Sequence, residues 1–380
     1  MMEQKFEIAI CGAGPVGMAL AALLVKRGVA PAGIALLDAK PLAGAVADPR
    51  SIALSYGSRT LLEEVAAWPI PATAIHQIHV SRRGHLGRSM MDRSEHQLDA
   101  LGYVARYGDV VTALAARVEA AGVSVIRPAR VTASAENGDG VVLSLDDGRT
   151  VQTQLIVQAE GGVFGEQDAK SLRRDYQQTA VIARVSATGA IAHRAYERFT
   201  GQGPLALLPQ DGADGHQYAL VWCVRPERAQ EILALDDAAF LEQLGQAFGT
   251  RLGRFSSASP RAAFPLGLNA VPQSATRTVA IGNAAQTLHP VAGQGLNLGL
   301  RDAAVLARLL ARGATPHALV EFAQAREADR STTVGLTDAM ARVFASEGPG
   351  QALLGLSLGV LDTLAPARLL LAELMMFGRR

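Results

Sequence analysis

A glycine-rich turn near the N-terminus restricts the possible folds of this chain more than any other feature. An apolar run over 6–10 predicts a buried strand before the turn, and a helical pattern follows from about Pro15 to Lys26. Between them stands the motif G-x-G-x-x-G, formed by Gly12, Gly14 and Gly17. Glycines at these positions permit a positive φ, let a pyrophosphate approach the backbone and let the helix lie close to the strand. The pattern predicts a Rossmann-like unit that binds a dinucleotide at the helix N-terminus.

An acidic residue at the end of a second predicted strand supports this interpretation. The sequence GIALLDAK ends that strand at Asp38, which lies 38 − 17 = 21 residues after Gly17. A carboxylate at this spacing accepts hydrogen bonds from ribose hydroxyls, and its charge disfavours a 2′-phosphate. The nucleotide is therefore expected to be FAD or NAD rather than NADP. The sequence that follows contains neither a second such motif nor a constellation typical of a dehydrogenase.

Composition sets broader limits. A length of 380 residues is typical of about two domains, and a net charge of +1 gives no reason to expect a nucleic-acid partner. Cys11 and Cys223 both stand in apolar runs, which favours buried thiols in a reducing cytoplasm over a disulfide or a metal site. The tail over 351–377 is unusually apolar but too interrupted to span a membrane. It is either a pair of packed helices or a surface that meets a lipid or a partner.

The pattern along the chain predicts two kinds of layer. Residues 110–121 carry an amphipathic helical pattern, and 131–160 alternate apolar and polar residues with tight turns, as a β-meander does. Strand signals dominate from 178 to 263, with one helical patch at 236–248. A strand that ends at Gly282 then returns the chain to the nucleotide-binding layer, and helices follow from Asn297.

The clustered histidines do not predict a metal site. His76, His79, His85 and His96 lack helical ligand spacing and an accompanying set of carboxylates, so a solvated loop is favoured. Neither a nucleophile-elbow motif nor a P-loop motif is present, which argues against hydrolases and NTPases.

Five longer motifs show which proteins the chain resembles. They are DPRSIALSYGSRTLLEEVAAW (48–68), GYVARYGDVVTAL (102–114), ERFTGQGPLALLP (197–209), YALVWC (218–223) and TVAIGNAAQTLHPVAGQGLNLGLRD (278–302). With the N-terminal motif, these segments resemble the UbiH-type (UbiH/VisC) flavin hydroxylases of ubiquinone biosynthesis. That group belongs to the p-hydroxybenzoate-hydroxylase-like class of FAD monooxygenases. The resemblance extends over nearly the whole chain in the same order.

The resemblance implies an α/β fold in which a Rossmann-like FAD-binding domain is assembled from discontinuous segments. Residues 1–75, 100–177 and 264–345 are expected to form that domain. Residues 76–99 and 178–263 are expected to form a mostly β substrate-binding domain, followed by C-terminal helices over 346–380.

Residues expected to bind FAD fall into two groups. The N-terminal motif and its acidic partner supply Gly12, Gly14, Pro15, Val16, Gly17 and Asp38. The resemblance adds Arg50, Ser51, Arg106, Glu160, Gly161, Gly282, Asn283, Pro290, Gly293, Gln294, Gly295, Leu296 and Asn297. The sequence GQG leads into a helix, so the free backbone N–H groups at the helix start are expected to face the N1–C2 edge of the flavin. Reduced flavin carries negative charge at that edge.

Two departures from the pattern of the group concern the cofactor site. Most relatives carry Asp-Ala-Ala-His where this chain has Asn283 to Gln286, so the acceptor oxygen is kept and its charge is lost. The segment GNAAQTLHP resembles the branch that acts on 2-polyprenyl-6-methoxyphenol. Glu160 replaces the usual aspartate and keeps its charge on a longer side chain.

The resemblance implies an enzyme that uses NAD(P)H and O2 to hydroxylate a prenylated phenol through a flavin C4a-hydroperoxide. His289 and Pro290 are the candidate catalytic residues, because they are expected to line the active side of the flavin. Peripheral contact with the inner membrane or with a ubiquinone-biosynthesis assembly is a further expectation. Two alternatives stay open: hydroxylation at another ring position or of another aromatic substrate, and a non-catalytic flavin-binding subunit.

Overall fold

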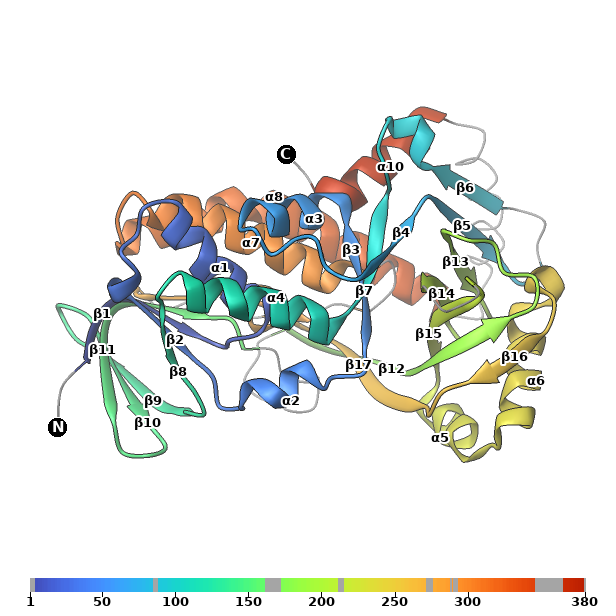
Figure 1. Cartoon of the computed structure of the whole chain (residues 1–380), viewed down its shortest axis with the longest axis horizontal. Helices are drawn as coiled ribbons and strands as arrows, with labels where there is room; N and C mark the ends of the chain where they lie inside the picture. Colours follow the sequence, from blue (N-terminus) through green and yellow to red (C-terminus); the bar gives the residue numbers. More distant parts are fainter. Residues whose placement is uncertain are drawn as a thin grey trace.

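Two large sheets, joined by a small one, organise the chain in the computed structural model (Figure 1). The structure describes residues 4–84, 88–160, 172–210, 215–270, 276–287, 289, 293–345 and 365–378.

The strands are β1 (Gln4–Cys11), β2 (Ile34–Leu37), β3 (Ser51–Ser55), β4 (Ala72–Ile75), β5 (Gln77–Arg82), β6 (Arg88–Asp92), β7 (Gly102–Arg106), β8 (Ser124–Ile126), β9 (Val131–Glu136), β10 (Val141–Leu145), β11 (Thr150–Gln158), β12 (Leu172–Ala187), β13 (Arg194–Phe199), β14 (Pro204–Gln210), β15 (Gln217–Val224), β16 (Phe255–Ala258), β17 (Ala262–Ala270), β18 (Thr278–Ala280) and β19 (Gln286–Thr287). The α-helices are α1 (Pro15–Lys26), α2 (Leu42–Val46), α3 (Tyr56–Glu64), α4 (Tyr107–Ala120), α5 (Pro226–Ala234), α6 (Asp237–Phe248), α7 (Gln294–Leu310), α8 (Pro316–Ala345) and α10 (Ala365–Phe377). Short 3-10 helices are η1 (Pro31–Gly33), η2 (Arg93–His96), η4 (Thr250–Leu252) and η5 (Gly282–Ala284).

The first sheet has a parallel centre. Its order is β8-β2-β1-β11-β10-β9, and β18 pairs with the C-terminal half of β11. β1, β2, β8, β11 and β18 are parallel, whereas β9 and β10 add antiparallel strands at one side. Ile8 and Ile10 pack under α1, α4, α7 and α8, and the other face carries Phe6, Ala9 and Cys11. Because both faces are covered, the parallel strands are nearly continuously apolar.

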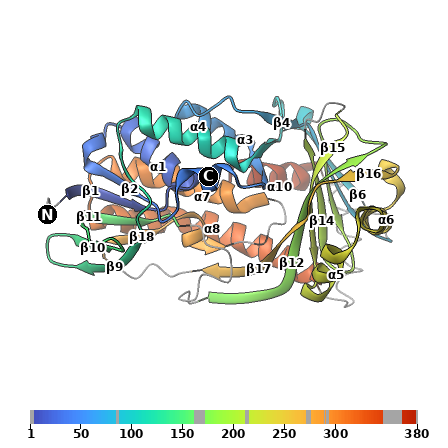
Figure 2. The same ribbon diagram turned by 60° about the horizontal axis from the view of Figure 1, so that its bottom comes forward.

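The second sheet is mostly antiparallel and lies at the other end of the molecule (Figures 1 and 2). Its order is β19-β17-β12-β15-β14-β13-β5-β6, with β16 paired to β12. One face packs against α5 and α6 through a core that includes Tyr196, Trp222 and Phe240. Strands from 77–92 therefore lie beside strands from 172–224, far apart in the sequence.

A three-stranded sheet, β3-β7-β4, joins the two large sheets. Ile75 and Val104 from this small sheet pack against Ala195 of β13 and Leu208 of β14. The face of the nine-stranded sheet that turns away from α5 and α6 therefore looks toward the cofactor-binding elements.

Several expectations from the sequence are confirmed by these elements. Helix α1 spans the predicted residues, and the meander is present as β9 to β11. The helix predicted at 236–248 begins after Asp236, whose side chain accepts a hydrogen bond from the Ala239 N–H. Both cysteines are buried and unbridged. The segment over 76–99 contributes β5 and β6, and α5 is an additional helix. The division into domains stays a prediction.

Helix α10 includes the described part of the apolar tail. Ala372 and Met376 are buried with Met91 and Leu101, whereas Leu370 is 68% exposed. Within the described residues, the helices are either too short or too polar to cross a bilayer.

Close packing of α1 on α7 predicts opposite effects of one substitution at two helical glycines. A Cβ at Gly299 would stand 2.7 Å from Cγ2 of Val16, whereas a Cβ at Gly335 in α8 would meet open space. Gly299→Ala should lower the free energy of unfolding by about 1–2 kcal/mol because the packed interface cannot expand without strain. Gly335→Ala should raise it by about 1 kcal/mol through helix propensity. Urea titrations of both variants test this, and equal effects would contradict the packing argument.

Candidate functional site

The C-terminal ends of four adjacent parallel strands gather the predicted cofactor residues. β2, β1, β11 and β18 lie side by side, and they are followed by Asp38, Gly12, Glu160 and Gly282 respectively. Ligands of α/β sheets bind at this edge because the loops there diverge and helix N-termini point toward it. Residues from three distant parts of the chain are thereby brought together.

The glycine turn leaves its backbone open at one position. Gly12 has a φ of +111°, and a Cβ there would stand 2.6 Å from the backbone of Glu160. A Cβ at Gly17 would collide with the Gly12 carbonyl at 1.9 Å. At Gly14 the nearest atom to a Cβ would be Oη of Tyr107, at 3.6 Å. The turn therefore packs tightly at its ends and exposes its centre, beside Pro15 at the start of α1.

Asp38 is held by the backbone of the same turn. Its Oδ2 accepts a hydrogen bond from the Ala13 N–H at 2.8 Å, and its Oδ1 accepts one from the Lys40 N–H at 2.8 Å. Arg127 stands 3.8 Å away. Each carboxylate oxygen has a second lone pair, so the side chain can still accept hydrogen bonds from ribose.

Glu160 is close enough to Asp38 for the two carboxyl groups to interact. Burial raises the pKa of Glu160, the negative charge of Asp38 raises it further, and Arg130 opposes the shift. Two carboxylates at one end of the site favour a ligand that donates hydrogen bonds, as ribose hydroxyls do. Gly161 lies outside the described residues.

Arg50 connects the cofactor edge with the nine-stranded sheet. Its Nε and Nη2 donate to the Asp48 carboxylate, with Nη2 and Oδ2 2.6 Å apart. Its guanidinium lies 4.9 Å from the ring centroid of Tyr107 and 5.8 Å from that of Phe264. Its Nη1 makes no hydrogen bond to the described residues. The neighbouring Ser51 accepts a hydrogen bond from Gln210 of β14 at 2.5 Å.

Arg106 stands opposite Ser51 in the ladder between β3 and β7, directly before α4. It is exposed and has no ion-pair partner in the described part of the chain. An exposed guanidinium of this kind is suited to a phosphate. Tyr107 follows Arg106 in the same motif. Of the two, only Arg106 was expected from the sequence to bind FAD.

The second half of the cofactor edge is the turn from β18 into α7. Gly293 adopts the left-handed conformation, with a φ of +61°, directly before the helix, and a Cβ there would stand 3.2 Å from Cβ of Ala53. Asn297 donates to the carbonyls of Ala53 and Gly293 and accepts from the Ser55 N–H. Its amide is thus used to fix β3 against the helix start, so we propose that it positions the site rather than contacting FAD.

Three further predicted residues surround this helix start. Asn283 is exposed, with its Oδ1 3.9 Å from the position of a Cβ on Gly295. Gln294 is buried, and its amide donates to the Met375 carbonyl of α10 at 3.3 Å. Leu296 is half-buried against the helical core.

A buried ion cluster, which was not predicted from the sequence, holds this turn in place. Asp302 of α7 has no exposed surface and accepts hydrogen bonds from Arg326 and Arg330 of α8 at 2.8 and 2.9 Å. It also accepts from the Gly282 N–H at 3.4 Å and from Gln286 at 3.3 Å. In the sequence, the pair Arg301 and Asp302 inside a largely apolar helical segment is the feature that could have indicated this cluster.

His289 is buried between the cofactor turn and the nine-stranded sheet. Its Nε2 lies 2.8 Å from Oε1 of Gln178, and its ring meets Tyr176 edge-on at 5.2 Å. Gln178 donates through its own amide nitrogen to the Gln202 carbonyl, so His289 carries its proton on Nε2. Burial lowers the pKa of His289 to about 4, and the ring is neutral at physiological pH. Pro290 lies outside the described residues.

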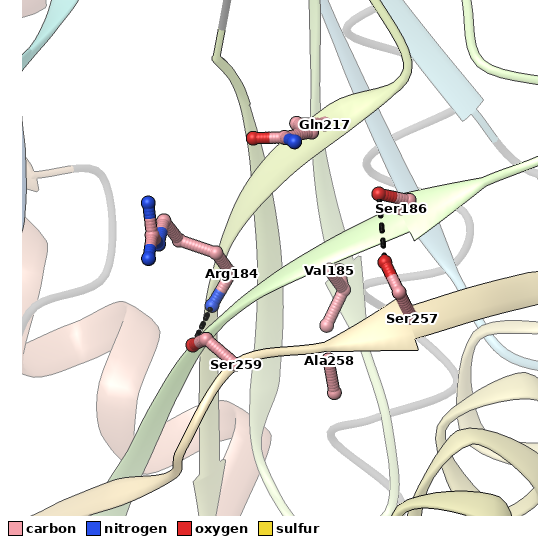
Figure 3. Close-up of a pocket in the computed structure, with 7 residues that line it drawn as sticks. All are labelled: Arg184, Val185, Ser186, Gln217, Ser257, Ala258 and Ser259. Carbon is pink, nitrogen blue, oxygen red and sulfur yellow. Dashed lines mark hydrogen bonds between the residues drawn. The ribbon is translucent and has the colours of Figure 1, made fainter. Parts of the chain in front are cut away.

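A shallow pocket elsewhere in the chain does not belong to this site. It lies between β12, β15 and β16 and is lined by Arg184, Val185, Ser186, Gln217 and 257–259 (Figure 3). A hydrogen bond joins Ser186 to Ser257 across it, and none of the predicted cofactor residues borders it.

The residues at the strand edge fit an FAD molecule. The open centre of the glycine turn and the start of α1 suit a pyrophosphate, and Asp38 suits a ribose. Arg50 and Arg106 each keep donors without partners among the described residues. The start of α7 supplies backbone N–H groups at the place expected for the flavin ring.

Asp38→Ala tests the ribose contact. Loss of hydrogen bonds to a charged acceptor, which contribute about 1.5–3 kcal/mol each, should raise the Kd for FAD by about ten- to a hundredfold. Titration of the apoprotein, followed by flavin fluorescence, measures the Kd. Asp147→Ala is the matched control, because this carboxylate pairs with Arg149 in a distant turn. An unchanged Kd in Asp38→Ala would contradict the assignment.

The low pKa of His289 predicts a dependence of stability on pH. The unfolded chain binds a proton near pH 6.5, whereas the folded chain does so only near pH 4. Stability contributed by neutral His289 is therefore present above pH 6.5 and is lost as pH falls toward 4, by at most about 3 kcal/mol. His289→Gln should flatten the free energy of unfolding between these limits. Urea titrations from pH 4 to 7 measure it; parallel curves for both proteins would refute the prediction.

Comparison with known proteins agrees with this geometry. A family model described as FAD binding domain matches residues 5–335. Ubiquinone hydroxylase UbiL of Rhodospirillum rubrum is 30% identical over 382 residues, covering 96% of this chain and 88% of that relative. The 3-demethoxyubiquinol 3-hydroxylase of Escherichia coli K12 is 29% identical over 321 residues, covering 82% and 81% respectively.

Solved structures show the same fold. PnpA, a p-nitrophenol 4-monooxygenase of Pseudomonas putida, aligns over 100% of both chains with a TM-score of 0.78 and 17% identity. PqsL of Pseudomonas aeruginosa, solved with 2-aminobenzoylacetate, aligns over 94% of this chain and 100% of that chain, with a TM-score of 0.76 and 21% identity. The chain therefore belongs to the FAD-binding-domain family and is an FAD-dependent monooxygenase, a flavin hydroxylase.

Proposed function

We propose that this protein hydroxylates a polyprenylated phenol in ubiquinone biosynthesis, with 2-polyprenyl-6-methoxyphenol as the preferred substrate. The observation that carries the proposal is an apolar face on the nine-stranded sheet, directed toward the cofactor edge. We call this the substrate face and define it by Ile78, Val80, Ile182, Ala206, Leu208 and Val221.

The substrate face is covered less completely than the opposite face of the same strands. In β14, Leu205 and Leu207 are buried against the α5–α6 side, whereas Ala206 and Leu208 are only half-buried. Val80 in β5 and Val221 in β15 show the same partial exposure. Central strands normally bury their apolar residues on both sides when another layer covers them. Half-buried apolar side chains on this face are suited to contact a ligand with an apolar tail.

Charge on the face supports a neutral phenol over a free aromatic acid. The cross-strand row formed by Ile182, Val221, Ala206 and Val80 contains Glu197 between the last two and carries no cation that could receive a carboxylate. The names of the relatives in ubiquinone biosynthesis support the same class of substrate.

Bound FAD would accept hydride from NAD(P)H and activate O2, which is the chemistry of the cofactor itself. The chain contributes position and electrostatics. Backbone N–H groups at the start of α7 stabilise negative charge on the ring, and Asp302 holds the preceding turn in place. Neutral His289 and Gln178 fix the distance between the flavin turn and the substrate face.

Peripheral contact with a membrane is a finer part of the proposal. Leu370 stands exposed on the apolar helix α10, which also touches the cofactor turn through Gln294. A substrate with a lipid tail would reach the substrate face from this side. Residues 346–364, which complete the apolar tail, lie outside the described residues.

The test is anaerobic reduction of the FAD-loaded protein by NADPH. A short-chain prenylated 2-methoxyphenol should accelerate bleaching of the flavin. Its half-saturating concentration should be at least about a hundredfold lower than that of 2-methoxyphenol, because burial of each CH2 contributes about 0.8 kcal/mol.

4-Hydroxybenzoate serves as the matched free acid and should have little effect. Faster reduction with the acid than with the prenylated phenol would refute the substrate class. A flavin that NADPH bleaches equally fast with and without every phenol would refute substrate control of reduction.

A further inference from the structure

Glu197 lies in the middle of the substrate face. In β13 its neighbour Tyr196 belongs to the core under α5 and α6, whereas Ala195 packs against the small sheet. Because side chains alternate along a strand, Glu197 shares the face of Ala195. Cys223 of β15 shares this face, and burial together with the negative charge of Glu197 raises the pKa of its thiol. The carboxylate therefore points toward the cofactor side of the sheet.

The cross-strand neighbours of Glu197 are apolar. In the ladders it stands opposite Ala206 of β14 and Val80 of β5. Val221 of β15 follows in the same row, opposite Ala206. The side chains in this cross-strand row therefore offer the Glu197 carboxylate neither a positive charge nor a hydrogen-bond donor.

One oxygen of this carboxylate has no partner. Oε1 of Glu197 is fully buried and accepts no hydrogen bond from the described residues, while the residue as a whole is half-buried. The adjacent Arg198 points to the other face, where its guanidinium lies 5.8 Å from the Phe248 ring and donates to Ser81. Burial raises the pKa of Glu197 to about 8. Such a group lowers stability unless a ligand satisfies it.

The substrate class of the proposed function supplies one matching donor. A prenylated methoxyphenol is apolar except for its methoxy oxygen, which only accepts, and one hydroxyl, which donates. We propose that Glu197 binds the hydroxyl of the phenol substrate and takes up its proton during hydroxylation. This assignment rests on the proposed function and adds the residue that orients the ring.

The proton transfer is balanced within the site. The O–H bond of the phenol breaks, an O–H bond forms on the Glu197 carboxylate, and the electron pair stays on the phenol oxygen. This electron pair is conjugated with the aromatic ring. The ring carbon that becomes hydroxylated is therefore more nucleophilic toward the oxygen atom that is transferred to it. A carboxyl with a raised pKa is a stronger base than an ordinary glutamate and is closer to a phenol in proton affinity.

The position of Glu197 also fits the flavin side of the site. A Cβ on Gly203 would stand 2.6 Å from the Cys223 carbonyl and 2.8 Å from the Gln178 amide, and Gln178 meets His289. Cys223 and Gln178 thus connect the surroundings of Glu197 with the cofactor turn. A ring held by Glu197 at its hydroxyl can extend toward that turn.

Binding of two matched ligands tests the assignment without turnover. The probes are the short-chain prenylated 2-methoxyphenol and its O-methyl ether, each titrated into oxidised FAD-loaded protein and followed by the flavin absorbance spectrum. Above pH 8, where the Glu197 carboxyl is ionised, the wild type should bind the phenol about ten- to a hundredfold more tightly than the ether, as expected for a hydrogen bond to a charged group. Glu197→Leu should reduce this preference to about twofold or less.

Two variants separate function from folding. Glu197→Leu should not lower Tm, because it removes a buried polar atom without a partner. The isosteric Glu197→Gln should fold and keep a preference of less than about tenfold, since its neutral amide oxygen still accepts a hydrogen bond. Glu242→Leu, at an exposed carboxylate of α6, is the control and should keep the wild-type preference.

The outcomes distinguish this inference from the proposed function. If the wild type hydroxylates the phenol but both Glu197 variants keep the full preference for it, Glu197 is not the acceptor and the proposed function still stands. If the wild type binds neither probe, or prefers the ether, both are overturned. A lower Tm in Glu197→Leu with unchanged preference in Glu197→Gln would assign a purely structural role to Glu197.

Discussion

The rest of the site depends on how Asp302 holds the turn between β18 and α7. This carboxylate is fully buried, and its charge is matched by Arg326 and Arg330 from the next helix. Its remaining lone pairs accept from the Gly282 backbone and from Gln286. Removing one partner of such a cluster leaves a buried charge without compensation. The turn at residue 282 is therefore fixed to α7 before any ligand arrives.

Packing of α1 against α7 further fixes the turn that the ion cluster holds. Val16 at the start of α1 lies against Gly282 and Gly299, so the start of α1 and the turn after β18 touch directly. Two segments about 270 residues apart thereby become one binding edge at the ends of β1 and β18. Arg50, between Tyr107 and Phe264, extends the same edge to the nine-stranded sheet. The cofactor and the substrate face are held by contacts among distant elements.

Ionisable side chains whose burial disfavours the charged form are concentrated where these elements meet. His289 stays neutral in an apolar setting, and Glu197 and Glu160 have raised pKa values. Perturbed groups of this kind are typical of functional sites because they are poised to exchange protons or receive ligands. The opposite face of the same sheet, under α5 and α6, is an ordinary apolar core. Under the proposed function, stability and substrate binding are divided between the two faces of one sheet.

The sequence predicted local features well and tertiary relations poorly. Helix α1 and the position of Asp38 after a strand follow from glycine spacing and hydrophobic periodicity, which act over a few residues, whereas α7 begins at Gln294, before the expected Asn297. The positioning role of Asn297 and the cluster around Asp302 could not be predicted, because their partners stand far away in the chain. Glu197 begins the motif ERFTGQGPLALLP, but nothing in the sequence distinguishes it, because only the strand register shows its apolar neighbours.

Turnover under isotopically labelled dioxygen tests the central claim most directly. The FAD-loaded protein is supplied with NADPH and a short-chain prenylated 2-methoxyphenol, and the product is analysed by mass spectrometry. The account predicts a hydroxylated phenol that contains one labelled oxygen atom for each NADPH consumed. A product whose new oxygen comes from water, or NADPH consumption without any hydroxylated phenol, would contradict it.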